Sequence, residues 1–101
     1  MTKVQFITST LQQQKPTLRQ FGVSRIGLFG SSVRSDSTPI SDIDMMVEFI
    51  PGKKTYKNFI GTATHLELVF GKQIDLVTPQ AISRHIKPYI DKDLQYVQIS
   101  N

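Results

Sequence analysis

The 101-residue sequence contains no cysteine. This absence excludes a disulfide framework and any metal site built from thiolates. The sequence also has no run of about 18 apolar residues, so it predicts no membrane-spanning helix. Its first residues, MTKVQFITST, include neither an apolar signal core nor a small-residue cleavage site. We therefore expect a cytoplasmic protein that does not associate with membranes.

Length and composition predict one globular domain covering residues 1–101, because no internal repeat or low-complexity tract divides the chain. The net charge of +4 favours nucleotides, nucleic acid or an acidic partner. The basic residues are scattered, however, and form a cluster only at Lys53, Lys54 and Lys57. Without a continuous basic stripe, direct binding of nucleic acid is not the favoured expectation, although it is left open.

Hydrophobic spacing predicts two helices, two strands, a helix, a strand and a helix, with a possible strand at the end. The expected helices cover residues 3–14, a short stretch from Pro16 to Phe21, 56–70 and 80–89. The expected strands cover residues 25–29, 42–50, 73–78 and, at the end, 94–99. In the last helix Ile82, Ile86 and Ile90 form an apolar stripe and Pro88 disturbs the end. The fold class is α/β of the α+β type, a small mixed β-sheet with helices packed on one face.

Three aspartates lie in the expected strands. Asp42 and Asp44 are separated by one residue, so their side chains share one face of a strand while the intervening isoleucine points to the other. Asp75 lies between two apolar residues in a second strand. If the strands are adjacent, the carboxylates converge, and such an oxygen-rich site suits Mg²⁺. On its own the Asp-x-Asp pattern is weak evidence, because solvent-facing aspartates are common on a one-sided sheet.

A glycine-serine turn follows the first expected strand. Gly30 permits a close backbone approach to a phosphate, and the hydroxyls of Ser31 and Ser32 can bond phosphate oxygens. We expect Ser31 to cap a short helix, from which Arg34 reaches the same anion. The turn is not a Walker loop, because the G-x-x-x-x-G-K pattern is missing. Alone it is a common turn.

The combination is far more specific. Gly30-Ser31 followed after ten residues by Asp42-Ile43-Asp44 resembles the G-S-x10-D-x-D signature of the DNA polymerase β-like nucleotidyltransferase superfamily. The segments LFGSSVR, SDIDMMVEF and GKQIDLVTP resemble its minimal nucleotidyltransferase (MNT) branch, over about residues 16–96. The resemblance implies a polymerase β-like fold in which Gly30 and Ser31 hold the triphosphate of ATP. It also implies that Asp42 and Asp44 bind two Mg²⁺ ions, and that Asp75 is the third metal-site acid and activates the acceptor hydroxyl.

The turn departs from the pattern of the family, whose members commonly read G-S-R-A-R-G. Here Ser32 replaces the first arginine and Ser35 the later glycine, whereas Arg34 keeps the second arginine. Ser32 and Arg34 complete the expected nucleotide-binding set. Losing one phosphate-facing cation is expected to weaken nucleotide binding or to change which nucleotide is preferred. Because all three carboxylates are present, we favour an active enzyme.

The resemblance also implies a partner. MNT proteins are often encoded beside HEPN-domain ribonucleases and act as their antitoxins by transferring AMP from ATP to a tyrosine hydroxyl of the toxin. The expected function is therefore that of a Mg²⁺-dependent protein adenylyltransferase acting on a HEPN-domain toxin. Two alternatives stay open: a non-catalytic antitoxin that neutralises its partner by forming a complex, and nucleotidyl transfer to RNA or a small molecule.

Other polar residues are expected to be structural. His65 and His85 share no metal-binding spacing, so a zinc site is not predicted. Glu48 lies on the same expected strand face as Asp44 but roughly 13 Å along it, and is interpreted as a surface or edge acid.

Overall fold

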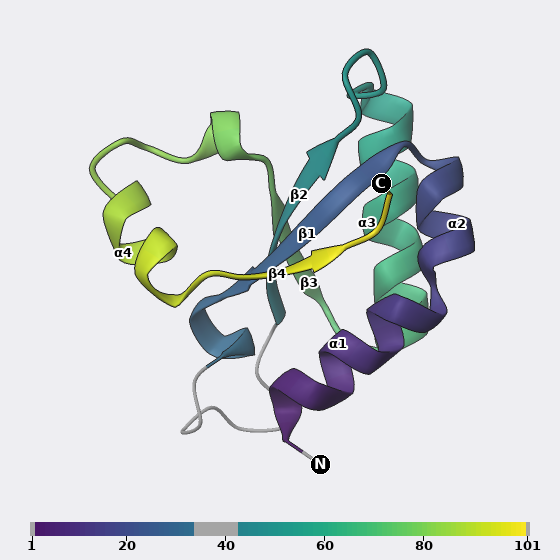
Figure 1. Cartoon of the computed structure of the whole chain (residues 1–101). Helices are drawn as coiled ribbons and strands as arrows, with labels where there is room; N and C mark the ends of the chain where they lie inside the picture. Colours follow the sequence, from purple (N-terminus) through teal and green to yellow (C-terminus); the bar gives the residue numbers. More distant parts are fainter. Residues whose placement is uncertain (1, 34–42, 101) are drawn as a thin grey trace.

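The computed structural model describes residues 2–33 and 43–100, with Ser31 through its backbone alone, and contains a four-stranded sheet (Figure 1). The strands are β1 (Val23–Phe29), β2 (Ile43–Phe49), β3 (Ile74–Val77) and β4 (Gln95–Gln98). Their order in the sheet is β3-β2-β1-β4. β1 pairs antiparallel with β2 and β4, whereas β2 pairs parallel with β3. The expected mixed sheet, including its last strand, is confirmed.

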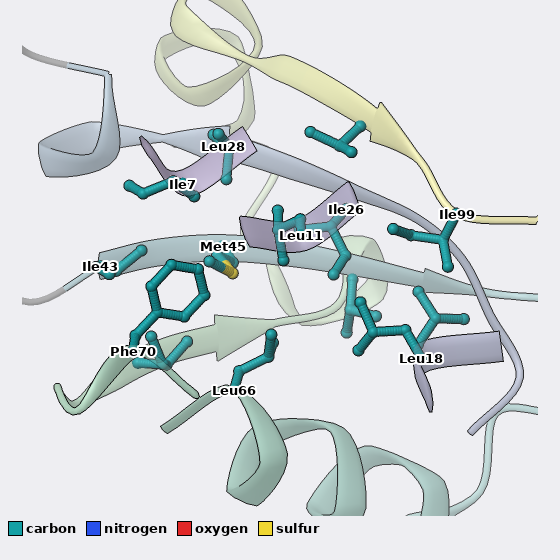
Figure 2. Close-up of a cluster of buried hydrophobic side chains, with 14 residues drawn as sticks. Ile7, Leu11, Leu18, Ile26, Leu28, Ile43, Met45, Leu66, Phe70 and Ile99 are labelled. Carbon is teal, nitrogen blue, oxygen red and sulfur yellow. The ribbon is translucent and has the colours of Figure 1, made fainter. Parts of the chain in front are cut away.

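Helices α1 (Lys3–Gln13), α2 (Lys15–Gln20) and α3 (Tyr56–Phe70) cover one face of this sheet (Figure 1). Figure 2 shows the apolar cluster between the two layers. The helices contribute Ile7, Leu11, Leu18, Leu66 and Phe70, and the strands contribute Val23, Ile26, Leu28, Ile43, Met45, Val47, Ile74 and Val97. Because strand side chains alternate between faces, the residues between these core positions point to the opposite side of the sheet.

Local sequence signals explain where the helices begin and end. Thr2 and Gln5 form a reciprocal capping box at the start of α1, with bonds of 3.1 Å and 3.0 Å. Thr55 caps α3, whose last residue is followed by Gly71 in the left-handed conformation at φ 64°. Pro16 occupies the first turn of α2, where its missing N–H is not needed. The predicted range of α3 is confirmed at both ends.

The segment after β3 differs from the prediction. In place of a helix over 80–89, a 3₁₀ turn η2 (Pro79–Ala81) is followed by α4 (Lys87–Asp93). A helix through 80–89 would put Pro88 in its interior, where proline removes a hydrogen bond and clashes with the preceding turn. Pro88 instead lies in the first turn of α4. Ile82, Ile86 and Ile90 therefore do not form one helical stripe, and Ile86 is 54% exposed.

The segment from η2 to α4 lies on the side of the sheet opposite to the other helices (Figure 1). Gly27 illustrates this arrangement. It lies between the core residues Ile26 and Leu28 in β1, so it belongs to the face of the sheet opposite to the core. A Cβ atom on Gly27 would lie 2.6 Å from the side chain of Leu94, just after α4, and 3.2 Å from Tyr96. The expectation of helices on one face thus holds for α1, α2 and α3, but not for α4, which lies on the opposite face. In the part of the chain described, no helix is long and apolar enough to cross a membrane.

We predict that Leu66→Ala lowers the free energy of unfolding by about 2–5 kcal/mol, because the side chain is completely buried and its loss leaves a cavity. Leu68→Ala is the matched control on the same helix, since Leu68 is 77% exposed, and should change stability by less than about 0.5 kcal/mol. Urea denaturation followed by circular dichroism measures both. Equal effects would contradict the assignment of the core face of α3.

Candidate functional site

Two of the predicted aspartates meet across the parallel strands β2 and β3. Asp44 and Asp75 are register partners in this pair. Adjacent strands lie about 4.8 Å apart and partner side chains share a face, so the two carboxylates lie next to each other. Their neighbours Ile43 and Ile74 point into the core, which turns the aspartates to the opposite face. Asp75 is exposed and Asp44 is half-buried.

The other predicted acid, Asp42, and the predicted phosphate ligand Arg34 lie outside the described residues. The side chain of Ser31 is likewise outside the description. The described part of the chain supplies two of the three predicted metal-site acids, and it holds no group of three or more histidine, cysteine, aspartate or glutamate side chains that could bind a metal.

The glycine turn lies directly against Asp44. Phe29, the last residue of β1, is the register partner of Asp44, and the 3₁₀ turn η1 (Gly30–Ser32) follows immediately. Gly30 has a φ of +57°, and a Cβ atom there would lie 2.5 Å from Oδ2 of Asp44. Two features therefore require glycine at this position. One is the left-handed backbone conformation, and the other is the lack of space for a side chain beside the carboxylate.

Ser32 fixes the backbone of Asp44. Its hydroxyl donates to the carbonyl oxygen of Asp44 and accepts from the amide nitrogen of the same residue, both at 2.8 Å. The side chain is completely buried, so it does not face the surface where a nucleotide would lie. Ser31 is also not the N-cap that we expected. It lies inside the 3₁₀ turn, which spans only three residues, and Phe29 is the residue that precedes this turn. No local sequence signal indicates this role of Ser32, because it depends on pairing with the next strand.

A cationic residue that the sequence reasoning missed lies near the carboxylates. Lys3 is half-buried in the first turn of α1. Burial and the positive charge of Lys72 lower the pKa of Lys3, and the negative charge of Asp44 partly opposes them. The first turn of α1 is held there by Phe6, whose ring meets that of Phe70 edge-on at 6.0 Å between centroids. The N-terminal helix thus brings positive charge to the site.

Beside the two carboxylates is a hollow of about 500 Å³. Phe29, Val77 and the two aspartates line it on the sheet, and Ile82 and Ile90 line it from the segment that crosses this face. Apart from the carboxylates its walls are largely apolar. The segment from η2 to α4, for which we had expected a continuous helix, therefore forms one wall of the hollow.

Glu48 belongs to a separate cluster on the same face. It accepts from Nε of Arg25 at 3.0 Å, and the guanidinium of Arg25 lies 3.7 Å from the centre of the Tyr96 ring. Burial, and then the charge of Glu48, raise the pKa of Tyr96. His65 bonds Gln14 at 2.8 Å. Glu48 is therefore a half-buried ion-pair partner on a central strand, not the surface or edge acid that we expected, whereas His65 is half-buried in α3 as expected.

The donors present fit a divalent cation. Asp44 and Asp75 offer hard oxygen ligands side by side at the exposed end of the strands, and the glycine leaves no side chain between the turn and Asp44. Mg²⁺ prefers one or two such carboxylates, with water and substrate phosphates completing its shell. The described residues therefore supply two of the oxygen ligands that a divalent cation would require.

Residues 11–99 match the nucleotidyltransferase domain family. The chain belongs to this family. Protein adenylyltransferase MntA from Thermococcus cleftensis is 35% identical over 98 residues, which cover 96% of this chain and 98% of that protein. A Methanocaldococcus jannaschii protein assigned by name to the protein adenylyltransferases is 35% identical over 94 residues, covering 90% and 94%. The predicted family is therefore confirmed.

A solved structure described as a minimal nucleotidyltransferase superposes on this chain with a TM-score of 0.68 and 22% identity. The match covers 87% of this nucleotidyltransferase and 93% of that chain. It confirms the predicted fold, a mixed sheet of the minimal nucleotidyltransferase type.

We predict that Gly30→Ala destabilises this nucleotidyltransferase more than Gly52→Ala and also weakens binding of divalent cations. Both glycines have positive φ, so both substitutions introduce backbone strain of about 1–2 kcal/mol. A Cβ atom on Gly52 would meet nothing within 4 Å, whereas one on Gly30 must displace the carboxylate of Asp44. Urea denaturation and titration with Mn²⁺ compare the pair. Equal stability and unchanged Mn²⁺ affinity would contradict the placement of Asp44.

Proposed function

We propose that this protein is a Mg²⁺-dependent adenylyltransferase that transfers AMP from ATP to a hydroxyl group of a partner protein. The observation that carries the proposal is the Gly30 turn seated against Asp44, which is itself in register with Asp75. Membership of the nucleotidyltransferase domain family supports the reaction class. The names of the relatives, protein adenylyltransferases, support AMP as the group and a protein as the acceptor.

Each site residue has a role in this proposal. Asp42, Asp44 and Asp75 would hold Mg²⁺, which supplies neutralising charge for the pyrophosphate leaving group. Gly30, Ser31 and Arg34 would bind the triphosphate, in keeping with the motif. Ser32 holds Asp44 in place through its backbone.

The transfer exchanges one phosphorus–oxygen bond for another. The acceptor oxygen attacks the α-phosphorus in line, and the bond from that phosphorus to the bridging oxygen of the β-phosphate breaks. Asp75, which is exposed, would take up the proton of the acceptor hydroxyl. Pyrophosphate leaves, and AMP remains joined to the acceptor.

The hollow beside the carboxylates favours tyrosine as the acceptor. A phenol ring matches the apolar walls formed by Phe29, Val77 and Ile90, and its hydroxyl would lie at the carboxylate end, near Asp75. A HEPN-domain toxin, the partner implied by the family resemblance, is the proposed source of this tyrosine.

Incubation with ATP labelled at the α-phosphate, Mg²⁺ and a HEPN-domain protein as the proposed partner tests the function. We expect label on a tyrosine of the partner, and Asp44→Asn should slow transfer on the order of 10²–10³-fold, the usual effect of removing one electrostatic contact to the transition state. Glu48→Gln is the control, because Glu48 lies on the same strand but pairs with Arg25. No transfer by the unaltered chain, or full activity of Asp44→Asn, would contradict the proposal.

The hollow yields a separate prediction. Ile90→Asp should raise the acceptor KM by about 10-fold or more, since it replaces an apolar wall that contributes about 1.5–3 kcal/mol when covered. The dissociation constant for ATP should stay unchanged. Ile86→Asp serves as the control, because Ile86 is exposed and does not line the hollow. An unchanged acceptor KM in Ile90→Asp would place the acceptor elsewhere.

The non-catalytic alternative loses part of its support. It relied on the departures of Ser32 and Ser35 from the motif, and Ser32 proves to hold the aspartate that a catalyst needs. Ser35 lies outside the described residues. A toxin neutralised equally well by an Asp42→Asn/Asp44→Asn variant would favour simple complex formation over AMP transfer.

A further inference from the structure

The outer side of helix α3 carries large apolar side chains along its whole length. Tyr56, Ile60 and Leu68 are 82%, 41% and 77% exposed. Their spacing of four and eight residues places them in one stripe, on the side of the helix opposite to the completely buried Thr62. Single exposed apolar residues are common on protein surfaces, but a stripe that follows a helix from end to end is typical of an interaction surface.

The exposed residues of α3 are arranged symmetrically about Thr62. They form three pairs, at two, five and six residues from it: Ile60 with Thr64, Lys57 with Glu67, and Tyr56 with Leu68. When two copies of a helix pack antiparallel around a two-fold axis at the level of residue 62, each member of a pair in one copy lies level with its counterpart in the other. Apolar side chains then lie level with apolar side chains, and the lysine lies level with the glutamate.

The charges on α3 favour this antiparallel orientation. Lys53 and Lys54 precede the helix and Lys57 lies in its first turn, whereas Glu67 lies in its last turn. Glu67 uses one carboxylate oxygen in a long bond of 3.5 Å from the amide of Ile74, and its side chain is exposed. Antiparallel packing brings the basic end of one helix to the glutamate and to the negative end of the helix dipole of the other. Parallel packing would bring lysines against lysines.

We propose that this protein forms a two-fold symmetric dimer in which the α3 helices of two copies pack antiparallel. The inference does not rest on the proposed function. Helix α3 covers one face of the sheet, and Asp44 and Asp75 lie on the opposite face, so both carboxylate pairs stay uncovered in the dimer (Figure 1).

The size of the contact predicts a reversible dimer. Helix α3 has 15 residues and is therefore about 22 Å long. One face of such a helix buries less than the roughly 800 Å² per partner of a stable interface. We expect a dissociation constant between about 10 μM and 1 mM, in the range of weak and transient association.

Sedimentation velocity of the full chain over this concentration range tests the proposal. The unaltered chain should shift from the mass of one chain to that of two. Ile60→Asp should weaken association by about tenfold or more, because it places an unpaired charge beside the two-fold axis. Ile86→Asp is the matched control and should leave association unchanged, since Ile86 is 54% exposed but lies in the segment on the opposite face of the sheet.

Charge reversal tests the orientation. Lys57→Glu and Glu67→Lys should each weaken self-association by about threefold or more at low salt, because either change sets like charges level with each other at two places in the dimer. An equal mixture of the two variants should associate at least as well as the unaltered chain, since every level in the mixed pair again joins opposite charges.

Three results would overturn the inference. The first is a chain that stays monomeric up to about 1 mM, above the range in which weak interfaces associate. The second is association that Ile60→Asp leaves unchanged or that Ile86→Asp disrupts, which would place the contact away from α3. The third is a mixture of the charge-reversal variants that associates no better than either variant alone, which would exclude the antiparallel pairing.

Discussion

The contact between the Gly30 turn and Asp44 is the constraint on which the rest of the site depends. It requires Phe29 and Asp44 to be register partners, and the two bonds from Ser32 to the Asp44 backbone fix that register. The parallel pairing of β2 with β3 then places Asp75 beside Asp44. A slip of one residue in β2 would turn Asp44 into the core and bring Met45 to the surface. The hydrophobic core and the carboxylate pair are therefore specified by the same alternation.

Like charges gather at this end of the sheet, and each group is stabilised by charge of the opposite sign. Asp44 and Asp75 repel each other unless a cation offsets them, while Lys3 and Lys72 oppose each other in the same region. A metal–nucleotide complex bound as proposed would offset the negative charge of the two aspartates through its metal ion. Binding of such a complex to the folded chain alone also stabilises the fold.

Sequence patterns were sufficient for most of the elements and for the outward positions of Asp44 and Asp75, but not for contacts between distant segments. The range of α3 and the outward position of Asp44 follow from local spacing, because alternation and capping act within a few residues. The helix expected over 80–89 was wrong, since the four-residue spacing of isoleucines was weighted above the rigid ring of Pro88. Ser32 bonds a residue 12 positions away, and the charge of Asp44 in β2 acts on Lys3 in α1. Such pairings exist only once the sheet and α1 are assembled.

The position of Ser32 explains why this residue of the turn supplies no positive charge. A serine that is buried beneath the turn can hold Asp44 from within, which a long cationic side chain at the same position could not do without leaving the core. The serine therefore holds Asp44 rigidly, but position 32 has no cationic side chain. Lys3 brings positive charge to the neighbourhood of Asp44 from α1, the helix that packs against the turn. The positive charge that Lys3 brings near Asp44 therefore depends on the docking of the first helix, and a change that loosens α1 would remove this charge without altering any residue of the motif.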